Sequence, residues 1–596
     1  MIHYRISTAA LNAHLFDVQL TVPAPDACQR FSLPVWIPGS YMVREFSRHL
    51  GAITARQGRR ELPVRQLSKN EWEVEGLGRG ALTLSYQVYA FDTSVRCAYL
   101  DAQRGFFNAG SLCLKVHGQE AMPHQIQLTD LPRTWQVATA MPPAAGTGPR
   151  HRYESADYDE LLDHPFELGL FWRGEFQARG VPHEFVVAGA LPIFDGERLL
   201  RDAQRICEEQ IDFWHLQGRR REAPPFGRYV FLLNATEDGY GGLEHRASTA
   251  LIATRRDLPR LGQTETSDGY VRLLGLISHE YFHTWNVKRL RPRDFAKFDY
   301  GQENYTELLW FFEGFTSYYD DLFLVRAGLI DEARYLKLLT GNVNTVLAGP
   351  GRRRQSVAQS SFEAWTKYYR QDENSPNSIV SYYVKGSLVA LCLDLSLRAA
   401  GAAGGGRTEP AKGASLDALM RLLWRETPDR LLDEAQVLAA VERLGSPALA
   451  AQLREWVHGC DDLPLAPLLE KFGVQWAADK LGLSQRLGLR VSESASTVTV
   501  KQVFSGGAAE AAGLQAGDEL IACNGWRLRK LEEALLSLSP KTPQRMELLV
   551  GREQRVLPLP LHLPLARPAG APVQLSLADK ASARLQSLRR AWLQGG

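Results

Sequence analysis

The residues best suited to chemistry are His279, Glu280 and His283, which form the pattern H-E-x-x-H. They end an apolar helical pattern that begins near Tyr270. Because residues four apart lie on one face of a helix, two imidazole nitrogens can lie about 2.0–2.1 Å from a single Zn²⁺. Glu280 lies beside that face, where a carboxylate can act as general base toward water. We therefore predict a zinc hydrolase.

A zinc site of this kind needs a third protein ligand, and four acidic residues downstream are candidates. They are Asp299, Glu303, Glu307 and Glu313. Their spacing does not choose among them. Glu313 stands in an apolar and aromatic helical stretch, residues 308–319, where a carboxylate is rarely left without a compensating charge or metal. Glu313 is the favoured third ligand, and one Zn²⁺ per chain is the expected cofactor.

Length and composition restrict the class of protein. A chain of 596 residues is too long for one hydrophobic core, so several domains are expected. Hydrophobic residues make up 45% and charged residues 23%, as in an ordinary globular protein. The formal net charge of +2 argues against nucleic acid or an acidic membrane surface as the main partner. No apolar run reaches the length of about 20 residues that a membrane span requires.

The N-terminus and the cysteines predict a compartment. Met1 leads directly into alternating sequence, without the basic and apolar regions of a signal peptide. The seven cysteines are scattered and include no C-x-x-C pair. Both features predict a cytoplasmic protein with reduced thiols.

Two regions precede and contain the zinc motif. Residues 1–165 predict a β-sandwich, because short alternating stretches are broken by Pro and Gly and no amphipathic helix stands out. Residues 166–400 mix helical and strand patterns and carry H-E-x-x-H, so they are predicted to form the catalytic domain. One helix is expected from Arg201 to Leu216, and a buried strand begins at Tyr229.

Three glycines precede an acidic residue in the segment 239–245, Gly-Tyr-Gly-Gly-Leu-Glu-His. Gly241 and Gly242 would let the backbone approach a ligand closely, and Glu244 could face that ligand. The signal is weak by itself. An ordinary turn is the favoured interpretation of the segment taken alone.

These motifs resemble known families. H-E-x-x-H followed by Glu313 resembles the gluzincin pattern, whose third ligand is a Glu on a second helix. The string from His279 to Pro292, H-E-Y-F-H-T-W-N-V-K-R-L-R-P, resembles the glycyl aminopeptidase family, a distant relative of the aminopeptidase N family. The resemblance implies a thermolysin-like catalytic domain and peptide substrates with a free N-terminus, with Gly and Ala preferred as the first residue. The interval between His283 and Glu313 is longer than in aminopeptidase N relatives, so residues 287–305 are expected to be an inserted loop near the site.

The resemblance also implies roles for two further residues. Aminopeptidase N relatives carry a G-x-M-E-N string whose Glu holds the free α-amine of the substrate. The string G-G-L-E-H at 241–245 is similar, with Leu and His as departures, which implies that role for Glu244. The relatives also place a transition-state Tyr in a Y-x-K-G string, which Tyr383 begins here on a helix predicted to run through Leu391. Tyr382 is adjacent, so the choice between the two tyrosines is open, and simple packing is the alternative for either.

The remaining sequence predicts four further parts. Residues 399–415, rich in Ala and Gly, predict a linker or surface loop. Residues 401–475 predict a helical subdomain, with a capping box that starts at Asp433 and a helix that starts after Ser446.

Residues 476–565 resemble a PDZ domain, a module that accepts a peptide as an added strand. The resemblance rests on G-L-Q-A-G-D-E-L-I at 513–521, whereas the carboxylate-loop pattern is present only in part, as L-G-L at 487–489. Peptide binding and intramolecular packing are both open as roles for this module, and its ligand is unknown. Residues 566–596 form a tail with a basic amphipathic helix near 580–593, which is expected to pack on the PDZ-like domain.

The combined interpretation is a multidomain α+β zinc aminopeptidase. Glu280 would take the proton of the attacking water and pass it to the leaving amine, and Tyr383 would stabilise the oxyanion together with the ion. Glu244 would pair with the α-ammonium and limit cleavage to the first peptide bond. One alternative is a thermolysin-type endopeptidase in which Glu244 does not exclude longer chains. The other is a PDZ peptide-binding scaffold with an inert zinc domain, which the intact Glu280 argues against.

Overall fold

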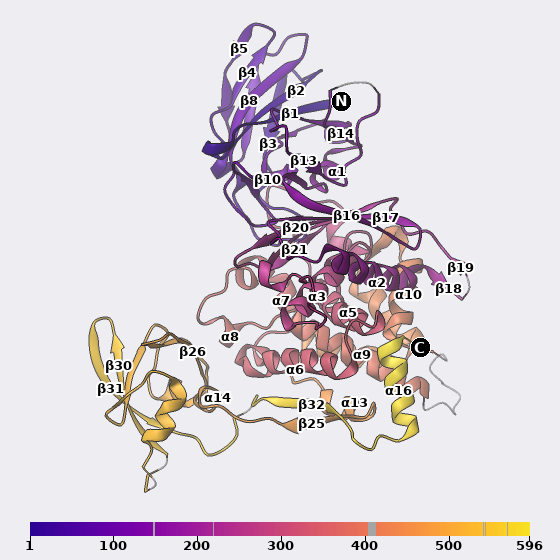
Figure 1. The fold of residues 1–596 in the computed structure, drawn as a ribbon. Helices are drawn as coiled ribbons and strands as arrows, with labels where there is room; N and C mark the ends of the chain where they lie inside the picture. The colour runs from indigo at the N-terminus through magenta and orange to yellow at the C-terminus, as the bar shows by residue number, and fades with distance from the viewer. Residues whose placement is uncertain are drawn as a thin grey trace. The chain divides into compact units, whose positions relative to one another are not determined.

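The chain divides into two compact units. Figure 1 shows the order of the helices and strands along the chain. The first comprises residues 1–304 and 428–431, and the second comprises residues 305–427 and 432–596. This computed structural model describes residues 1–146, 149–218, 220–402, 413–539, 541–542, 544–568 and 570–595. Among these residues, no helix is both long and apolar enough to cross a membrane.

The N-terminal part of the first unit is built from three β-sheets, which confirms the predicted β domain. The largest sheet has the order β14–β12–β1–β2–β8–β4–β5. Its strands are β1 (Ile2–Ala10), β2 (Leu15–Val22), β4 (Thr54–Gln57), β5 (Arg60–Leu62), β8 (Leu82–Tyr89), β12 (His124–Thr129) and β14 (Arg152–Ser155). Alternate side chains of these strands enter a single core, as the period-2 pattern requires.

Two four-stranded sheets complete this part, in the orders β13–β15–β10–β9 and β11–β3–β7–β6. Their strands are β3 (Cys28–Ser32), β6 (Val64–Gln66), β7 (Glu71–Glu75), β9 (Ala98–Leu100), β10 (Arg104–Phe107), β11 (Lys115–Val116), β13 (Gln136–Ala138) and β15 (Phe166–Gly169). Among the described residues of this part, the only α-helix is the five-residue α1 (Tyr158–Leu162). Because β15 pairs with β10 and β13, these sheets extend a few residues past 165.

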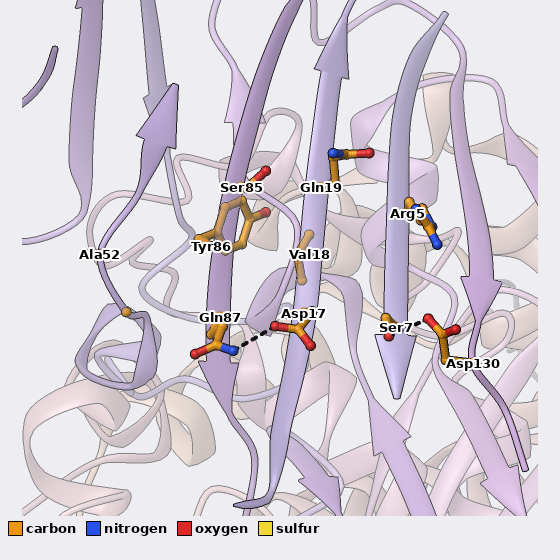
Figure 2. A pocket seen from close by; sticks show the side chains of 11 residues that line it. Arg5, Ser7, Asp17, Val18, Gln19, Ala52, Ser85, Tyr86, Gln87 and Asp130 are labelled. Carbon is orange, nitrogen blue, oxygen red and sulfur yellow. Dashed lines mark hydrogen bonds between the residues drawn. The ribbon is translucent and has the colours of Figure 1, made fainter. Parts of the chain in front are cut away.

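The face of the largest sheet that does not enter the core is polar. A pocket of about 520 Å³ lies on strands β1, β2 and β8. Gln19 and Gln87 are among its lining side chains (Figure 2). Gln87 donates to Asp17 at 2.7 Å, and Ser7 donates to Asp130 at 2.6 Å. These side chains pair with one another across the strands, and none of them is a predicted site residue. This face therefore belongs to the solvated surface of the sheet.

The rest of the first unit is a mixed sheet with two helices. Its strand order is β16–β17–β20–β22–β21, with β20 parallel to both β17 and β22. The strands are β16 (Phe171–Ala178), β17 (Val181–Ala188), β20 (Tyr229–Thr236), β21 (Gly241–Glu244) and β22 (Ser248–Thr254). Helix α2 (Gly196–His215) packs against β16, and α3 (Asp268–Phe282) packs against β21 and β22 (Figure 1). The sheet thus supports the helix that carries H-E-x-x-H.

The segment for which a turn is favoured by sequence is an edge strand. In β21, Gly241 lies opposite Ile252 and Glu244 lies opposite Thr249. The turn prediction is wrong here because pairing with β22 outweighs the weak local preference of the glycines. Since side chains alternate along a strand, Gly242 and Glu244 face the same side of the sheet.

The second unit is mainly helical before its PDZ-like part. Its helices are α4 (Leu309–Phe312), α5 (Gly314–Arg326), α6 (Glu332–Ala348), α7 (Val357–Phe362), α8 (Ser375–Ser378), α9 (Val384–Ala402), α10 (Leu416–Glu426), α11 (Glu434–Leu444), α12 (Pro447–His458) and α13 (Leu465–Glu470). Asp433 and Gln436 form the predicted capping box of α11, and Ser446 caps α12. Both of these local predictions are confirmed.

The stretch predicted as a linker, residues 399–415, divides into three pieces. Residues 399–402 continue helix α9, and residues 413–415 lead into α10. Residues 403–412 lie outside the described residues.

The PDZ-like part has a core of its own and is inserted into a two-stranded ribbon. Its sheet has the order β26–β27–β28–β30–β31, with β29 paired to β28. Its elements are α14 (Leu483–Leu487), β26 (Leu489–Glu493), β27 (Val498–Val503), α15 (Ala508–Ala511), β28 (Glu519–Cys523), β29 (Trp526–Arg527), β30 (Arg545–Arg552) and β31 (Arg555–His562). The chain enters through β25 (Val474–Ala478) and leaves through β32 (Val573–Leu577). These two strands are antiparallel, with Ala478 opposite Val573.

The C-terminal helix α16 (Ala583–Gln594) packs on α5 and α9. Trp592 is fully buried, and its indole donates to the hydroxyl of Tyr318 at 2.9 Å. Arg398 donates to the backbone carbonyl of Ala591 at 2.6 Å. The prediction that this helix packs on the PDZ-like domain is wrong. An amphipathic pattern shows that one face is buried but does not identify the surface that covers it.

The ribbon allows a test of how independent the PDZ-like part is. We expect that replacing residues 479–572 by a two-residue Asn-Gly turn leaves the second unit folded, because the turn joins Ala478 to Val573 and suits a two-residue hairpin. Truncation after residue 478 should be far more damaging, because it also removes Trp592, and losing a buried Trp costs about 3–5 kcal/mol. Thermal unfolding of the two variants would check this. Equal stability of the excised and truncated proteins would contradict it.

Candidate active site

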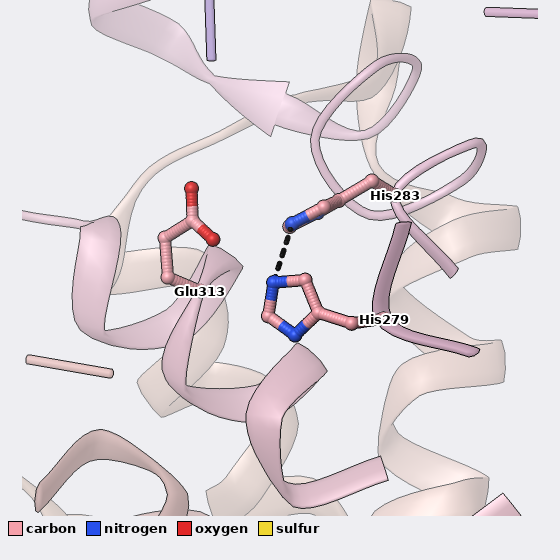
Figure 3. Close-up of side chains that lie close together, drawn as sticks. All are labelled: His279, His283 and Glu313. Carbon is pink, nitrogen blue, oxygen red and sulfur yellow. Dashed lines mark hydrogen bonds between the residues drawn. The ribbon is translucent and has the colours of Figure 1, made fainter. Parts of the chain in front are cut away.

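Two histidines at the end of α3 present their Nε2 atoms to the same point. The Nε2 atoms of His279 and His283 are 3.0 Å apart (Figure 3). The Nδ1 atom of His283 lies 2.8 Å from the backbone carbonyl oxygen of Asn286. This contact orients the imidazole ring of His283 so that its Nε2 atom points away from the helix end. Two ligands of a tetrahedral zinc ion, each about 2.0–2.1 Å from it, lie about 3.3 Å apart. The histidine pair therefore fits one ion.

Glu313 joins helices α4 and α5. Its backbone N–H donates to Leu309 and its carbonyl accepts from Ser317, both at 2.8 Å, so helical backbone continues through it. The residue is 2% exposed. One ligand atom each from His279, His283 and Glu313 lie within 4.8 Å of one another (Figure 3). Two imidazoles and a carboxylate are a donor set that suits zinc.

The other acidic candidates for the third ligand do not lie with the two histidines of the motif. Glu307 belongs to a different group of potential metal ligands, together with Glu434 and His458. Asp299 and Glu303 belong to none of the groups of potential metal ligands in the described part of the chain.

Helices α5 and α9 cross closely beside Glu313. A Cβ atom on Gly314 would lie 2.6 Å from the Cα of Gly386, and one on Gly386 would lie 2.8 Å from the carbonyl oxygen of Trp310. Only glycine fits on both sides of this crossing. The glycine of the Y-x-K-G string thus has a packing role, and it brings the start of α9 to Glu313. Tyr383 lies one residue before α9, not on the helix as the sequence predicts.

Tyr383 belongs to a cluster of four tyrosines, of which the sequence motif marks only one. Its hydroxyl is 3.2 Å from that of Tyr369, and its ring stacks on Tyr368 and on the fully buried Tyr382. Burial, and next the carboxylate of Glu313, raise the pKa of Tyr383 well above its usual value. The phenol is therefore a hydrogen-bond donor at neutral pH. Tyr368 and Tyr369 lie in no recognisable motif.

Glu280 packs directly on the edge strand β21. A Cβ atom on Gly242 would lie 2.1 Å from Oε1 of Glu280, so only glycine leaves room for this carboxylate. Arg96, from the N-terminal sheets, donates to the carbonyl oxygen of Gly242 at 3.0 Å. No sequence pattern marks Arg96, because its contact spans most of the first unit.

Glu244 faces the same side of β21, two residues beyond Gly242. The residue is 4% exposed, and its Oε1 atom has no hydrogen-bond partner among the described residues. A Cβ atom on Gly39 would lie 2.4 Å from its Oε2 atom, so the loop at residues 36–41 presses on the carboxylate. A buried carboxylate oxygen without a partner is costly unless a ligand or water completes it.

A buried ion network fixes the chain on both sides of this site. The carboxylate of Asp163 accepts from Nζ of Lys288 at 2.7 Å and from the backbone N–H of Arg246 at 2.9 Å. His245 Nδ1 lies 3.4 Å from it. Burial would raise the pKa of Asp163, but the charge of Lys288, followed by His245 and Arg246, holds it well below its usual range. Asp163 thus ties the end of β21 to the segment that follows the H-E-x-x-H helix.

Comparison with known proteins agrees with this arrangement. Residues 3–170 match the Peptidase M61 N-terminal domain, residues 272–389 match the M61 glycyl aminopeptidase family, and residues 477–550 match the PDZ domain. A search of curated proteins found no match. The second match contains both histidines of the motif, Glu313 and Tyr383.

One solved structure extends the similarity over the whole chain. An aminopeptidase N family protein from Idiomarina loihiensis is 37% identical, covers 100% of both chains and has a TM-score of 0.90. An M1 zinc metallopeptidase from Deinococcus radiodurans is 15% identical, covers 78% of this chain and 94% of its own, and has a TM-score of 0.45. From the full-length similarity and the ordered family matches, the chain belongs to the M61 glycyl aminopeptidase family and is a metallo-aminopeptidase.

Proposed function

We propose that this protein is a zinc aminopeptidase that removes the first residue of peptides and prefers Gly or Ala at that position. The observation that carries the proposal is the shared face of β21. The carboxylate of Glu280 packs on Gly242, and Glu244 projects from the same face two residues further on. One carboxylate is suited to proton transfer, and the other to holding a free amine.

His279, His283 and Glu313 are the proposed ligands of one Zn²⁺. Catalytic zinc sites use three such side chains and keep a fourth position open. The contact of His283 Nδ1 with a backbone carbonyl supports this assignment, because metal-binding histidines usually donate their other N–H in this way. When bound, zinc supplies a Lewis acid and lowers the pKa of water toward about 7.

Glu280 and Tyr383 carry out the proton transfer and the charge stabilisation. Glu280 takes the proton from the attacking water and passes it to the leaving amine. Its contact with Gly242 restricts the position of the carboxylate. Tyr383, protonated at neutral pH, donates a hydrogen bond to the oxygen that becomes negative as the carbonyl is attacked.

Glu244 limits cleavage to the first peptide bond by holding the α-ammonium. Residues two apart in a strand have Cα atoms about 6.6 Å apart, so the backbone of Glu244 lies about one such repeat from Gly242, the residue on which the carboxylate of Glu280 packs. The amine nitrogen and carbonyl carbon of one residue are about 2.5 Å apart. The nitrogen can lie about 3 Å from the carboxylate of Glu244, and the carbon is attacked by the water from which Glu280 takes a proton. This span accommodates one residue. A second residue would add about 3.3–3.6 Å.

Metal analysis of three variants tests the ligand assignment. Glu313→Ala should lose the metal, because it leaves two protein ligands. Glu280→Gln should retain one Zn²⁺ per chain and lose turnover, because it removes the base and no ligand. Glu307→Ala is the matched control and should keep both metal and activity. Metal retained by Glu313→Ala, or lost by Glu307→Ala, would show that the third ligand is assigned wrongly.

N-acetylation of the substrate tests the role of Glu244. It removes the charge of the amine and leaves the carboxylate buried without its partner, a penalty on the order of 2–5 kcal/mol. At 1.36 kcal/mol per decade, kcat/KM should fall about 30- to 5,000-fold. Glu244→Gln should lose activity on free peptides and discriminate far less between the two forms. The exposed Glu237 offers a matched control, Glu237→Gln, that should behave as wild type. Equal rates on Gly-Ala-x and acetyl-Gly-Ala-x peptides would indicate an endopeptidase instead.

A further inference from the structure

A short π-helix lies beside the tyrosine that the proposed function uses as an oxyanion donor. It spans Ala364–Tyr368, and the backbone N–H of Tyr369 donates to the carbonyl oxygen of Ala364, five residues earlier, at 3.1 Å. Hydrogen bonds with this spacing are rare in proteins and occur frequently at functional sites. The C-terminal end of this irregular turn presents two neighbouring tyrosines, Tyr368 and Tyr369.

Tyr368 connects the π-helix to the start of helix α9. Its hydroxyl lies 3.1 Å from that of Ser381, which also accepts from the backbone N–H of Val384 at 3.1 Å. The ring of Tyr368 lies 4.7 Å from that of Tyr382 and stacks on that of Tyr383 at 5.6 Å. The π-helix is therefore packed against the segment that carries Tyr383.

Tyr369 contacts the one group of Tyr383 that takes part in the proposed chemistry. Their hydroxyl oxygens are 3.2 Å apart, either oxygen can be the donor, and both side chains are half-buried. Hydrogen bonds of catalytic groups are often long in ligand-free enzymes and shorten in the transition-state complex. A tyrosine hydroxyl has one proton to donate and an oxygen that accepts. When Tyr383 donates its proton to substrate, its oxygen can accept the proton of Tyr369.

The backbone of Tyr383 is held separately from its side chain. Its carbonyl oxygen accepts from the backbone N–H of Ser387 at 2.9 Å, so it belongs to the first turn of α9. This bond fixes where the ring begins but not the direction of the phenolic proton, which can rotate about the C–O bond. A hydrogen bond to the phenolic oxygen can fix that direction.

We propose that Tyr369 is a positioning residue that acts through Tyr383: its hydroxyl donates to the oxygen of Tyr383 and directs the Tyr383 proton toward the scissile carbonyl. The inference rests on the proposed function, in which Tyr383 donates to the carbonyl oxygen as it becomes negative. As Tyr383 donates, negative charge moves onto its own oxygen, and the hydrogen bond from Tyr369 becomes stronger. In this arrangement Tyr369 makes no contact with substrate, so its contribution appears in turnover rather than in substrate binding.

Tyr369→Phe provides the first test, because it removes the hydroxyl and keeps the ring. On Gly-Ala-x peptides, kcat should fall about tenfold, as expected for one hydrogen bond to a group that develops charge, while KM should stay within about twofold. Tyr305→Phe is the matched control, because Tyr305 is exposed and its ring packs on Phe362 and Trp365 beside the same turn. This control should behave as wild type. Zinc content, measured on both variants, should match wild type.

A double-mutant cycle distinguishes positioning from an independent structural role. Tyr383→Phe alone should lower kcat about 10²- to 10³-fold, as the loss of an oxyanion donor does. In the Tyr383→Phe background, Tyr369→Phe should have no further effect, because the hydroxyl through which Tyr369 acts is absent. A structural contribution of Tyr369 would instead lower kcat by the same factor in both backgrounds.

The outcomes separate the positioning role from the proposed function. A wild-type kcat in Tyr369→Phe, or an equal loss in both backgrounds, would overturn the role of Tyr369 and leave the aminopeptidase intact. A wild-type kcat in Tyr383→Phe would show that the proposed function assigns the oxyanion donor wrongly, and the inference would fall with it. Equal rates of wild type on free and acetylated peptides would refute the aminopeptidase itself.

Discussion

The contact between Gly242 and Glu280 is the constraint on which the rest of the site depends. The carboxylate occupies the space that any side chain at position 242 would need, with a separation of 2.1 Å to a Cβ atom. This contact therefore fixes the distance between the edge strand β21 and the H-E-x-x-H helix. Because side chains alternate along β21, this close approach also fixes Glu244 relative to Glu280. One close backbone approach thus places both carboxylates, which we propose for proton transfer and for amine binding.

The N-terminal β domain contributes contacts that hold the segments on both sides of the zinc motif in place. Arg96 holds the carbonyl oxygen of Gly242, and Asp163 binds Lys288 and the end of β21. Each contact joins the β domain to the segments that flank the zinc motif. A buried pair such as Asp163 with Lys288 contributes through placement more than through net stability, since desolvation offsets most of the charge attraction. The same domain places Gly39 against Glu244.

Local chemistry could be predicted from the sequence, and long-range contacts could not. The H-E-x-x-H helix and the cap at Asp433 follow from the spacing of neighbouring residues, and the structure has both. The position of Glu313 in a group of potential metal ligands could be anticipated, because a carboxylate in an apolar stretch requires compensation. The strand at β21 and the position of α16 were predicted wrongly, because ladder pairing and helix packing depend on partners distant in sequence. For the same reason no pattern marks Gly39 or Asp163.

The central claim is that one zinc ion is shared by His279, His283 and Glu313 at the site where Glu280 acts. Anomalous scattering from crystals of the full chain, collected on both sides of the zinc absorption edge, tests it most directly. The account predicts one strong anomalous peak about 2.0–2.2 Å from Nε2 of each histidine and from a carboxylate oxygen of Glu313. A fully occupied ion bound to Glu303 or Glu307 in place of Glu313, or crystals of active enzyme with no zinc peak at the histidines, would contradict it.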